Sequence, residues 1–285
     1  MTVNTKMSKL FKPFSLAVLL ALVIGGMTTA PVLAQEYKES YNAAIEAAKA
    51  KEYTTAYTAF VEAARLADDA GDKEVAQRAR KVAAQIDYNT GKQLVASENF
   101  EEGLARFEQG IALFPQYANN YSGKALALKK LNRDDDAIQA YQELIDYGNT
   151  NDDSQAIREG EKGIRDHYIY LASSALGRRS DPTANDAREA IGYIESLQEF
   201  VEADADVYFY LAAANNTLGN YEEAIQYADQ ALELHSGSRS DAAKIHFVKG
   251  EALMFNGNTA AAKESFQSAT FGNYKSLAEH YLETL

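Results

Sequence analysis

The sequence predicts an all-α protein built as a solenoid of stacked helical hairpins. Residues 207–235 form the clearest hairpin, in which two helical segments flank Gly219-Asn220, a pair typical of a left-handed helix stop followed by an N-cap. Glu223 lies three positions after Asn220, as in a capping box. The second segment carries one apolar stripe at helical spacing: Tyr221, Ala224, Ile225, Ala228, Ala231 and Leu232.

The same hairpin pattern recurs along the chain. Gly103 and Ala137 are 34 positions apart, and so are Ala190 and Ala224. Other second-helix segments repeat the alternation of small and large side chains: Tyr53, Ala56, Phe60 and Ala63; Phe100, Gly103, Phe107 and Gly110; Ala137, Tyr141 and Leu144; Ala262, Phe266 and Ala269. One hairpin cannot bury its own apolar face, so these copies are expected to stack.

A helical hairpin with this period, built on alternating aromatic and small residues, resembles the tetratricopeptide repeat. The resemblance covers roughly residues 37–272. It implies a right-handed α-solenoid of about six hairpins with a C-terminal capping helix. The expected hairpins span about 37–70, 73–116, 118–148, 154–202, 205–236 and 240–272, and the capping helix spans 274–285.

Residues 1–34 are interpreted as a cleaved signal peptide, which leaves 35–285 as a single solenoid domain. Three lysines precede the apolar run SLAVLLALVIGGM, and Val32-Leu33-Ala34 forms a small-residue cleavage site. The run is about 13 residues long, against about 20 for a membrane span. The signal and the absence of Cys favour an exported bacterial protein of the periplasm. Secretion and outer-membrane association are the alternatives.

Two first helices are expected to be unusually long. The segment KEVAQRARKVAAQ adds about three and a half turns before Tyr88, and it contains no Gly or Pro. A second long apolar face precedes and includes Tyr168. The large tyrosines of the repeats are expected to serve as core residues: Tyr53, Tyr121, Tyr141, Tyr168, Tyr208 and Tyr221.

The charge balance narrows the class of partner. Without residues 1–34 the chain has 25 basic and 41 acidic side chains, a net charge of −16. Such a surface disfavours nucleic acid and anionic membranes, whose binding depends on Lys and Arg. It is compatible with a basic protein partner, and it also serves solubility. Arg178-Arg179 stands out against this background, which suggests contact with an acidic partner.

The sequence shows no reaction centre. It lacks Cys, HExxH, GxSxG and phosphate-binding glycine loops, and its four histidines lie in separate segments: His167, His235, His246 and His280. We therefore expect a non-catalytic protein without cofactor or metal. The Asp-rich stretch near Asp152 lacks the glycine and glutamate of a calcium loop, so helix capping explains it better.

The resemblance implies that the first helix of each hairpin lines a concave groove for a partner segment. The matching residues proposed to bind are Tyr41, Tyr88, Lys92, Leu126, Lys129, Phe209, Asn216, Phe247, Glu251 and Met254. The leading hypothesis is a scaffold that gathers other envelope proteins. A solenoid that binds glycan or peptidoglycan through its aromatic residues is the alternative, and self-association remains open. In the last segment, Tyr274, Leu277, Ala278 and Tyr281 are expected to form the apolar face of the cap.

Overall fold

The computed structural model describes residues 29–178 and 180–285, and within them it contains helices but no strand. The helices are α1 (Thr29–Lys49), α2 (Tyr53–Asp69), α3 (Lys73–Ala96), α4 (Phe100–Leu113), α5 (Asn119–Lys130), α6 (Asp134–Asn151), α7 (Ser154–Leu176), α8 (Ala184–Gln198), α9 (Ala205–Leu218), α10 (Tyr221–Leu234), α11 (Arg239–Phe255), α12 (Thr259–Ser268), the 3-10 helix η2 (Gly272–Tyr274) and α13 (Lys275–Thr284). The all-α prediction is confirmed.

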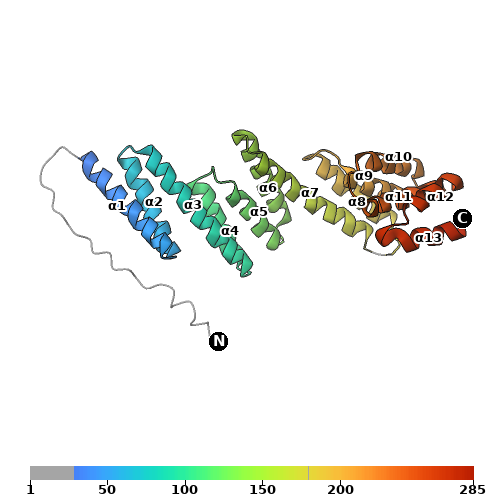
Figure 1. The fold of residues 1–285 in the computed structure, drawn as a ribbon, viewed down its shortest axis with the longest axis horizontal. Coiled ribbons are helices and arrows are strands. Elements are labelled where there is room, and N and C mark those ends of the chain that lie inside the picture. Colours follow the sequence, from blue (N-terminus) through green and yellow to red (C-terminus); the bar gives the residue numbers. More distant parts are fainter. Residues whose placement is uncertain (1–28, 179) are drawn as a thin grey trace, which may run out of the picture.

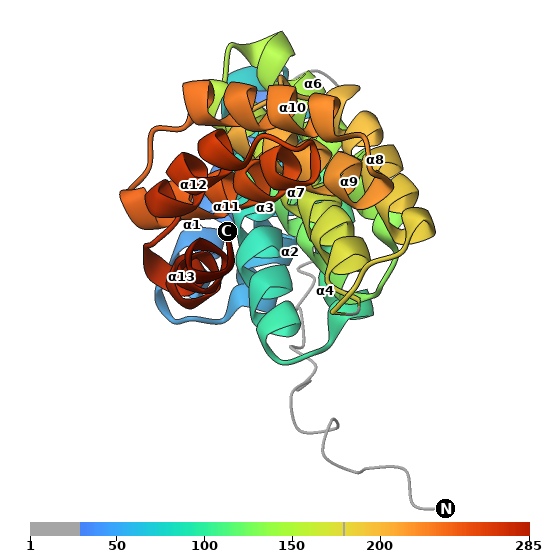
Figure 2. The ribbon, with the colours of Figure 1, turned by 90° about the vertical axis from the view of Figure 1, so that its right-hand side faces the viewer.

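The helices form an elongated stack in chain order (Figure 1). Each helix packs against the next, and the first helices of consecutive hairpins also touch, as α3 with α5, α7 with α9, and α9 with α11. Seen from its C-terminal end, the stack ends in α13 beside α11 and α12 (Figure 2). Contacts between near neighbours in sequence are what define a solenoid.

Most of the predicted signal peptide lies outside the described residues. The described part opens with α1 at Thr29, so this helix runs through the expected cleavage point before Gln35. Further along α1, Tyr37 is buried and donates a hydrogen bond of 2.7 Å to Asp72 Oδ2. This contact ties α1 to the N-cap of α3.

The two long first helices are confirmed. Helix α3 has 24 residues and α7 has 23, whereas the other first helices that follow α3 have between 12 and 17. Asp153 caps α7 by accepting hydrogen bonds from the amides of Gln155 and Ala156. Its neighbour Asp152 closes α6 in the left-handed conformation. Capping therefore explains the Asp-rich stretch, as expected.

Consecutive helices, both within a hairpin and between hairpins, meet where aromatic rings lie directly on glycine backbones, which we call ring-on-glycine contacts. They pair Phe107 of α4 with Gly91 and Gly123, Tyr141 of α6 with Gly163, and Phe266 of α12 with Gly250. A methyl group built on Gly91 would lie 2.8 Å from the Phe107 ring, closer than carbon atoms approach in proteins. Only glycine lets the two helices approach this closely.

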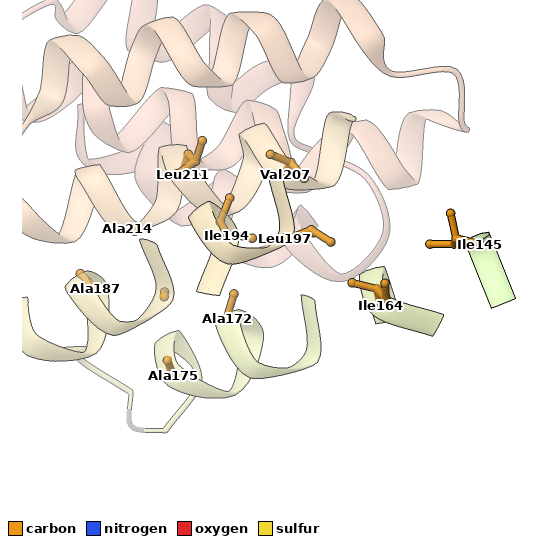
Figure 3. Packing of buried hydrophobic residues seen from close by; sticks show 11 residues of the cluster. Ile145, Ile164, Ala172, Ala175, Ala187, Ile194, Leu197, Val207, Leu211 and Ala214 are labelled. Carbon is orange, nitrogen blue, oxygen red and sulfur yellow. The ribbon is translucent and has the colours of Figure 1, made fainter. Parts of the chain in front are cut away.

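The largest buried cluster joins α6, α7, α8 and α9 in the middle of the stack (Figure 3). Ile164, Ile194, Leu197 and Val207 are at most 1% exposed. Small residues fill the remaining space, since Ala172, Ala175, Ala187, Ala190 and Ala214 are also buried. The core is thus continuous from one hairpin to the next, as a stack of units with shared apolar faces requires.

Helix capping differs from the prediction at one site. Asn220 precedes α10, but its side chain donates to Asn215 Oδ1 at 3.0 Å instead of capping the helix. The expected capping box with Glu223 is therefore wrong. Capping boxes occur at the starts of α8 and α11, in Thr183 with Asp186 and in Ser238 with Asp241. The predicted left-handed stop at Gly219 is confirmed, with φ +81°.

Two predicted core residues are exposed. Tyr53 is the first residue of α2, where the ring lies beside a cavity instead of inside the stack. Leu277 is half exposed on α13, because Ala278 and Tyr281 face the preceding helices in its place. The remaining tyrosines of that prediction are partly buried, as packing residues at the edge of a hairpin are.

Replacement of Gly91 by Ala is expected to destabilise the fold by about 1–3 kcal/mol, the usual cost of overpacking a filled core. The buried Phe107 ring has no space to give way. The matched control is Gly192→Ala in α8, where nothing lies within 4 Å of the added methyl group. That variant should gain about 0.5–1 kcal/mol from helix propensity. Urea unfolding measures both, and an equal effect of the two variants would refute the ring-on-glycine contact.

Candidate functional site

The residues proposed to line the groove lie, as a set, on first helices of the hairpins. Tyr41 is on α1, Tyr88 and Lys92 on α3, Leu126 and Lys129 on α5, Phe209 and Asn216 on α9, and Phe247, Glu251 and Met254 on α11. The structure brings four of them together at the C-terminal end of the stack: Phe209, Asn216, Phe247 and Glu251. The other six are distributed along the molecule.

The N-terminal aromatics pack inside their own hairpins. Tyr41 meets Phe60 edge to face, with ring centroids 5.3 Å apart. Tyr88 lies between Phe107, at 6.0 Å, and Tyr117, at 5.9 Å. Aromatic pairs at these distances stabilise helix packing. Both tyrosines therefore support the stack, and each presents only part of its ring to solvent.

Three other groove residues lie at the surface. Lys92 lines a cavity of about 450 Å³ together with Tyr53 and Ile86, at the junction of α2 and α3. Leu126 is 44% exposed on α5, and Lys129 is exposed on the same helix. An exposed leucine beside a lysine presents an apolar contact next to a positive charge. Met254 differs from these three, since it packs with the partly buried side chains of the α11–α13 cluster.

The four C-terminal residues line one cavity of about 710 Å³. Its described walls come from α9 and α11, from the end of α7, from Tyr221 at the start of α10, from Tyr274 in η2, and from Gly177 and residues 180–182 of the α7–α8 connection. Phe209 and Phe247 are only 8% and 7% exposed, so their outer surfaces form its floor. We call this space the C-terminal cavity. Its volume lies within the range of ligand-binding cavities in proteins.

Glu251 is a partly buried acid that lines the C-terminal cavity. It accepts a hydrogen bond of 3.2 Å from the Tyr281 hydroxyl through Oε1, and the Asn216 amide lies 3.5 Å from Oε2. Burial raises the pKa of Glu251 to about 6, while the Tyr281 hydrogen bond opposes that rise. The side-chain oxygen of Asn216, Oδ1, is buried and has no hydrogen-bond partner among the described residues. The cavity thus contains polar groups that its own walls do not fully satisfy.

An ion-pair network fixes the helices around this cavity. Arg165 of α7 donates to Asp204 Oδ2 at 2.7 Å and to Asp206 Oδ2 at 2.5 Å. Lys244 of α11 donates to Asp206 Oδ1 at 2.6 Å, and its ammonium group lies 4.6 Å from the centre of the Phe209 ring. The carboxylate of Asp206 on α9 thereby joins three consecutive first helices, α7, α9 and α11. Sequence reasoning missed this network, because its members are about 40 positions apart.

The α7–α8 connection contributes to the site in a way that the sequence did not indicate. Ser180, Asp181 and Pro182 of this connection line the cavity. Arg178, which with Arg179 was expected to contact an acidic partner, binds Glu189 at 3.0 Å and Asp186 at 3.1 Å within the chain. Arg179 lies outside the described residues.

Within the described residues, no group of three or more His, Asp or Glu side chains is arranged to hold a metal ion. The four histidines lie on α7, α11 and α13 and at the end of α10, so their predicted separation is confirmed. Burial lowers the pKa of both His167 and His246. None of the described helices has the length and apolar character needed to span a bilayer.

These observations define the class of the protein as an α-solenoid of helical hairpins with small residues at the close contacts between helices. The family model described as tetratricopeptide repeat matches residues 88–154 and 179–239. These two stretches of the chain therefore carry tetratricopeptide repeats. Proteins of this family in general serve as scaffolds for interactions between proteins.

Several solved structures resemble the chain. A thermophilic tetratricopeptide repeat protein of Thermus thermophilus shares 17% identity over 70% of this chain and 97% of that one, with a TM-score of 0.34. The repeat domain of P58(IPK) shares 14% identity over 89% of this chain and 65% of that one, with a TM-score of 0.37. A tetratricopeptide repeat protein from Parabacteroides merdae shares 13% identity over 87% of this chain and 98% of that one, with a TM-score of 0.32. No curated protein matches the chain in sequence.

The Glu251→Gln variant is expected to change how stability depends on pH. The raised pKa means that Glu251 binds its proton more tightly in the folded than in the unfolded protein. Its contribution to the free energy of unfolding is therefore full below about pH 4.5 and is lost as pH rises towards 6. A pKa shift of this size changes the free energy of unfolding by about 2 kcal/mol. Urea unfolding from pH 4.5 to 7.5 should therefore show a shallower decline for the variant. Parallel curves for variant and wild type would contradict the burial of this carboxyl.

Proposed function

We propose that the protein is a non-catalytic scaffold of the bacterial cell envelope that binds a segment of a partner protein along the first helices of its hairpins. The observation that carries the proposal is the C-terminal cavity, where α9 and α11 together present Phe209, Asn216, Phe247 and Glu251. Aromatic and polar side chains line this partly open cavity together, so it offers both the apolar contacts and the orienting polar groups of a recognition site. The family's general role supports a protein as the ligand.

The surface further along the stack supports a binding site that extends beyond the cavity. Leu126 of α5 is exposed outside the cavity, and Phe255 at the end of α11, which lines the cavity, is more exposed still. Both residues belong to first helices, which touch their counterparts in neighbouring hairpins. A partner segment laid across these helices would bury both apolar side chains, which water otherwise surrounds.

Photo-crosslinking in cells tests the proposed binding surface. A photoreactive amino acid at Leu126 or Phe255, which are 44% and 56% exposed, is expected to capture the same discrete proteins. The control position is Leu234 at the end of α10, a second helix, where the side chain is 50% exposed. The control should capture little. Equal capture at all three positions, or none at the two test positions, would refute binding along the first helices.

The envelope location rests on the N-terminal signal pattern and is tested separately. We expect the mature chain to begin at Gln35 and to appear in the periplasmic fraction. Mass spectrometry of the purified mature protein determines its first residue. The control replaces Ala34 with Lys, a bulky charged residue at the cleavage site, and should leave the precursor uncut. A wild-type chain that keeps residues 1–34 in the cytoplasm would exclude export.

A further inference from the structure

The C-terminal cavity has a chemical character of its own. Six aromatic side chains line it: Phe209, Tyr210, Tyr221, Phe247, Phe255 and Tyr274. Two carboxylic acids, Asp181 and Glu251, also line it, and none of the described lining residues is Lys, Arg or His. The combination of aromatic rings and carboxylates is the environment in which proteins bind organic cations, because the ring faces and the carboxylates both attract positive charge.

The carboxylate of Glu251 is surrounded by neutral groups. Within the described residues no basic side chain lies within ion-pair distance of it, and its two polar contacts come from Tyr281 and Asn216. The nearby ammonium of Lys244 is bound to Asp206 at 2.6 Å and lies over the Phe209 ring. A carboxylate that is partly withdrawn from water and has no counter-ion is unfavourable, and a ligand cation would relieve that cost.

The free space at Glu251 indicates the shape of that cation. Oε1 is occupied by the Tyr281 hydroxyl, whereas Oε2 has only the long 3.5 Å contact to Asn216 among the described residues. One available oxygen suits the single-point contact of an ammonium group better than the two-point fork of a guanidinium group. The aromatic walls would hold an alkyl stem.

We propose that the C-terminal cavity binds an alkylammonium group, supplied by a lysine side chain of the partner segment. The inference rests on the proposed scaffold function, because that function supplies a protein segment as the occupant. The overall charge of the chain agrees with it, since an excess of acidic groups attracts a basic segment. Anionic ligands are disfavoured by the two carboxylic acids that line the cavity.

The test measures binding of small probes to the whole protein by NMR. The probes are n-butylammonium, neutral n-butanol and butyrate, together with a capped Gly-Lys-Gly peptide and its norleucine counterpart. Butylammonium and the lysine peptide are expected to bind, each about tenfold more tightly than its uncharged counterpart. Affinity should fall about fivefold or more from pH 7.5 to pH 5, because only about one tenth of Glu251 is ionised at pH 5.

Variants assign the binding to this cavity. Glu251→Gln keeps the shape of the side chain and should abolish the preference for butylammonium over butanol. Phe255→Ala removes a half-exposed ring that stacks on Tyr221 and should weaken butylammonium several-fold with little effect on folding. Glu233→Gln on the exposed face of α10 is the matched control and should bind as wild type. Circular dichroism confirms that each variant is folded.

Each outcome bears on the inference. Equal binding of butylammonium and butanol, preference for butyrate, or an unchanged preference in both cavity variants overturns it. Binding of butylammonium without binding of the lysine peptide overturns the assignment to a protein segment. Failure of the scaffold function is seen separately, as the absence of cross-links at Leu126 and Phe255. Cross-links without any cation preference leave the scaffold function intact and overturn only the ligand class.

Discussion

The structure depends on how closely consecutive helices approach, and the ring-on-glycine contacts set that distance. Phe107 lies between Gly91 and Gly123, so a single ring fixes α4 against both α3 and α5. Alanines at 0% exposure perform the same task where no glycine is present, as Ala212 and Ala224 do in the hairpin of α9 and α10. A larger side chain at any of these points would separate the helices and change the angle at which the next hairpin stacks.

This close packing explains why a cavity forms near the end of the stack. Helices α9 and α11 are held side by side, and the link from Lys244 through Asp206 to Arg165 adds α7 to the same unit. Gly177, residues 180–182 and Tyr274 complete the described lining of this space. Helix α13 completes the arrangement, because Tyr281 stacks on the Phe266 ring at 4.7 Å and donates to Glu251. The cap is thus also part of the site.

The sequence predicts the repeat better than the site. Spacing alone identifies the hairpin around Gly219, since its left-handed stop and its apolar stripe are local signals. It also places Glu251 on a first helix, but the neighbours of Glu251 come from residues 35 positions before it and 30 after it. No periodicity reveals that Tyr281 would point its hydroxyl at this carboxylate. Side-chain direction at the end of a solenoid depends on the cap, and the cap is where the repeat pattern stops.

Burial raises the pKa of two carboxyl groups, Asp87 and Glu251, to about 6. Their surroundings show that Asp87 has a structural role, whereas Glu251 is available to a ligand. Asp87 is fully buried, lies 3.3 Å from Arg106 and lines neither cavity, so its charge is compensated from within. Its Oδ2, unpaired within the described residues, faces the protein interior near no ligand-sized space found there. Glu251 has no such arginine in the described part of the chain, and it borders about 710 Å³ of aromatic-lined space. Burial therefore makes Asp87 a constraint on the stack, whereas Glu251 is only partly buried and is available to the proposed ligand cation.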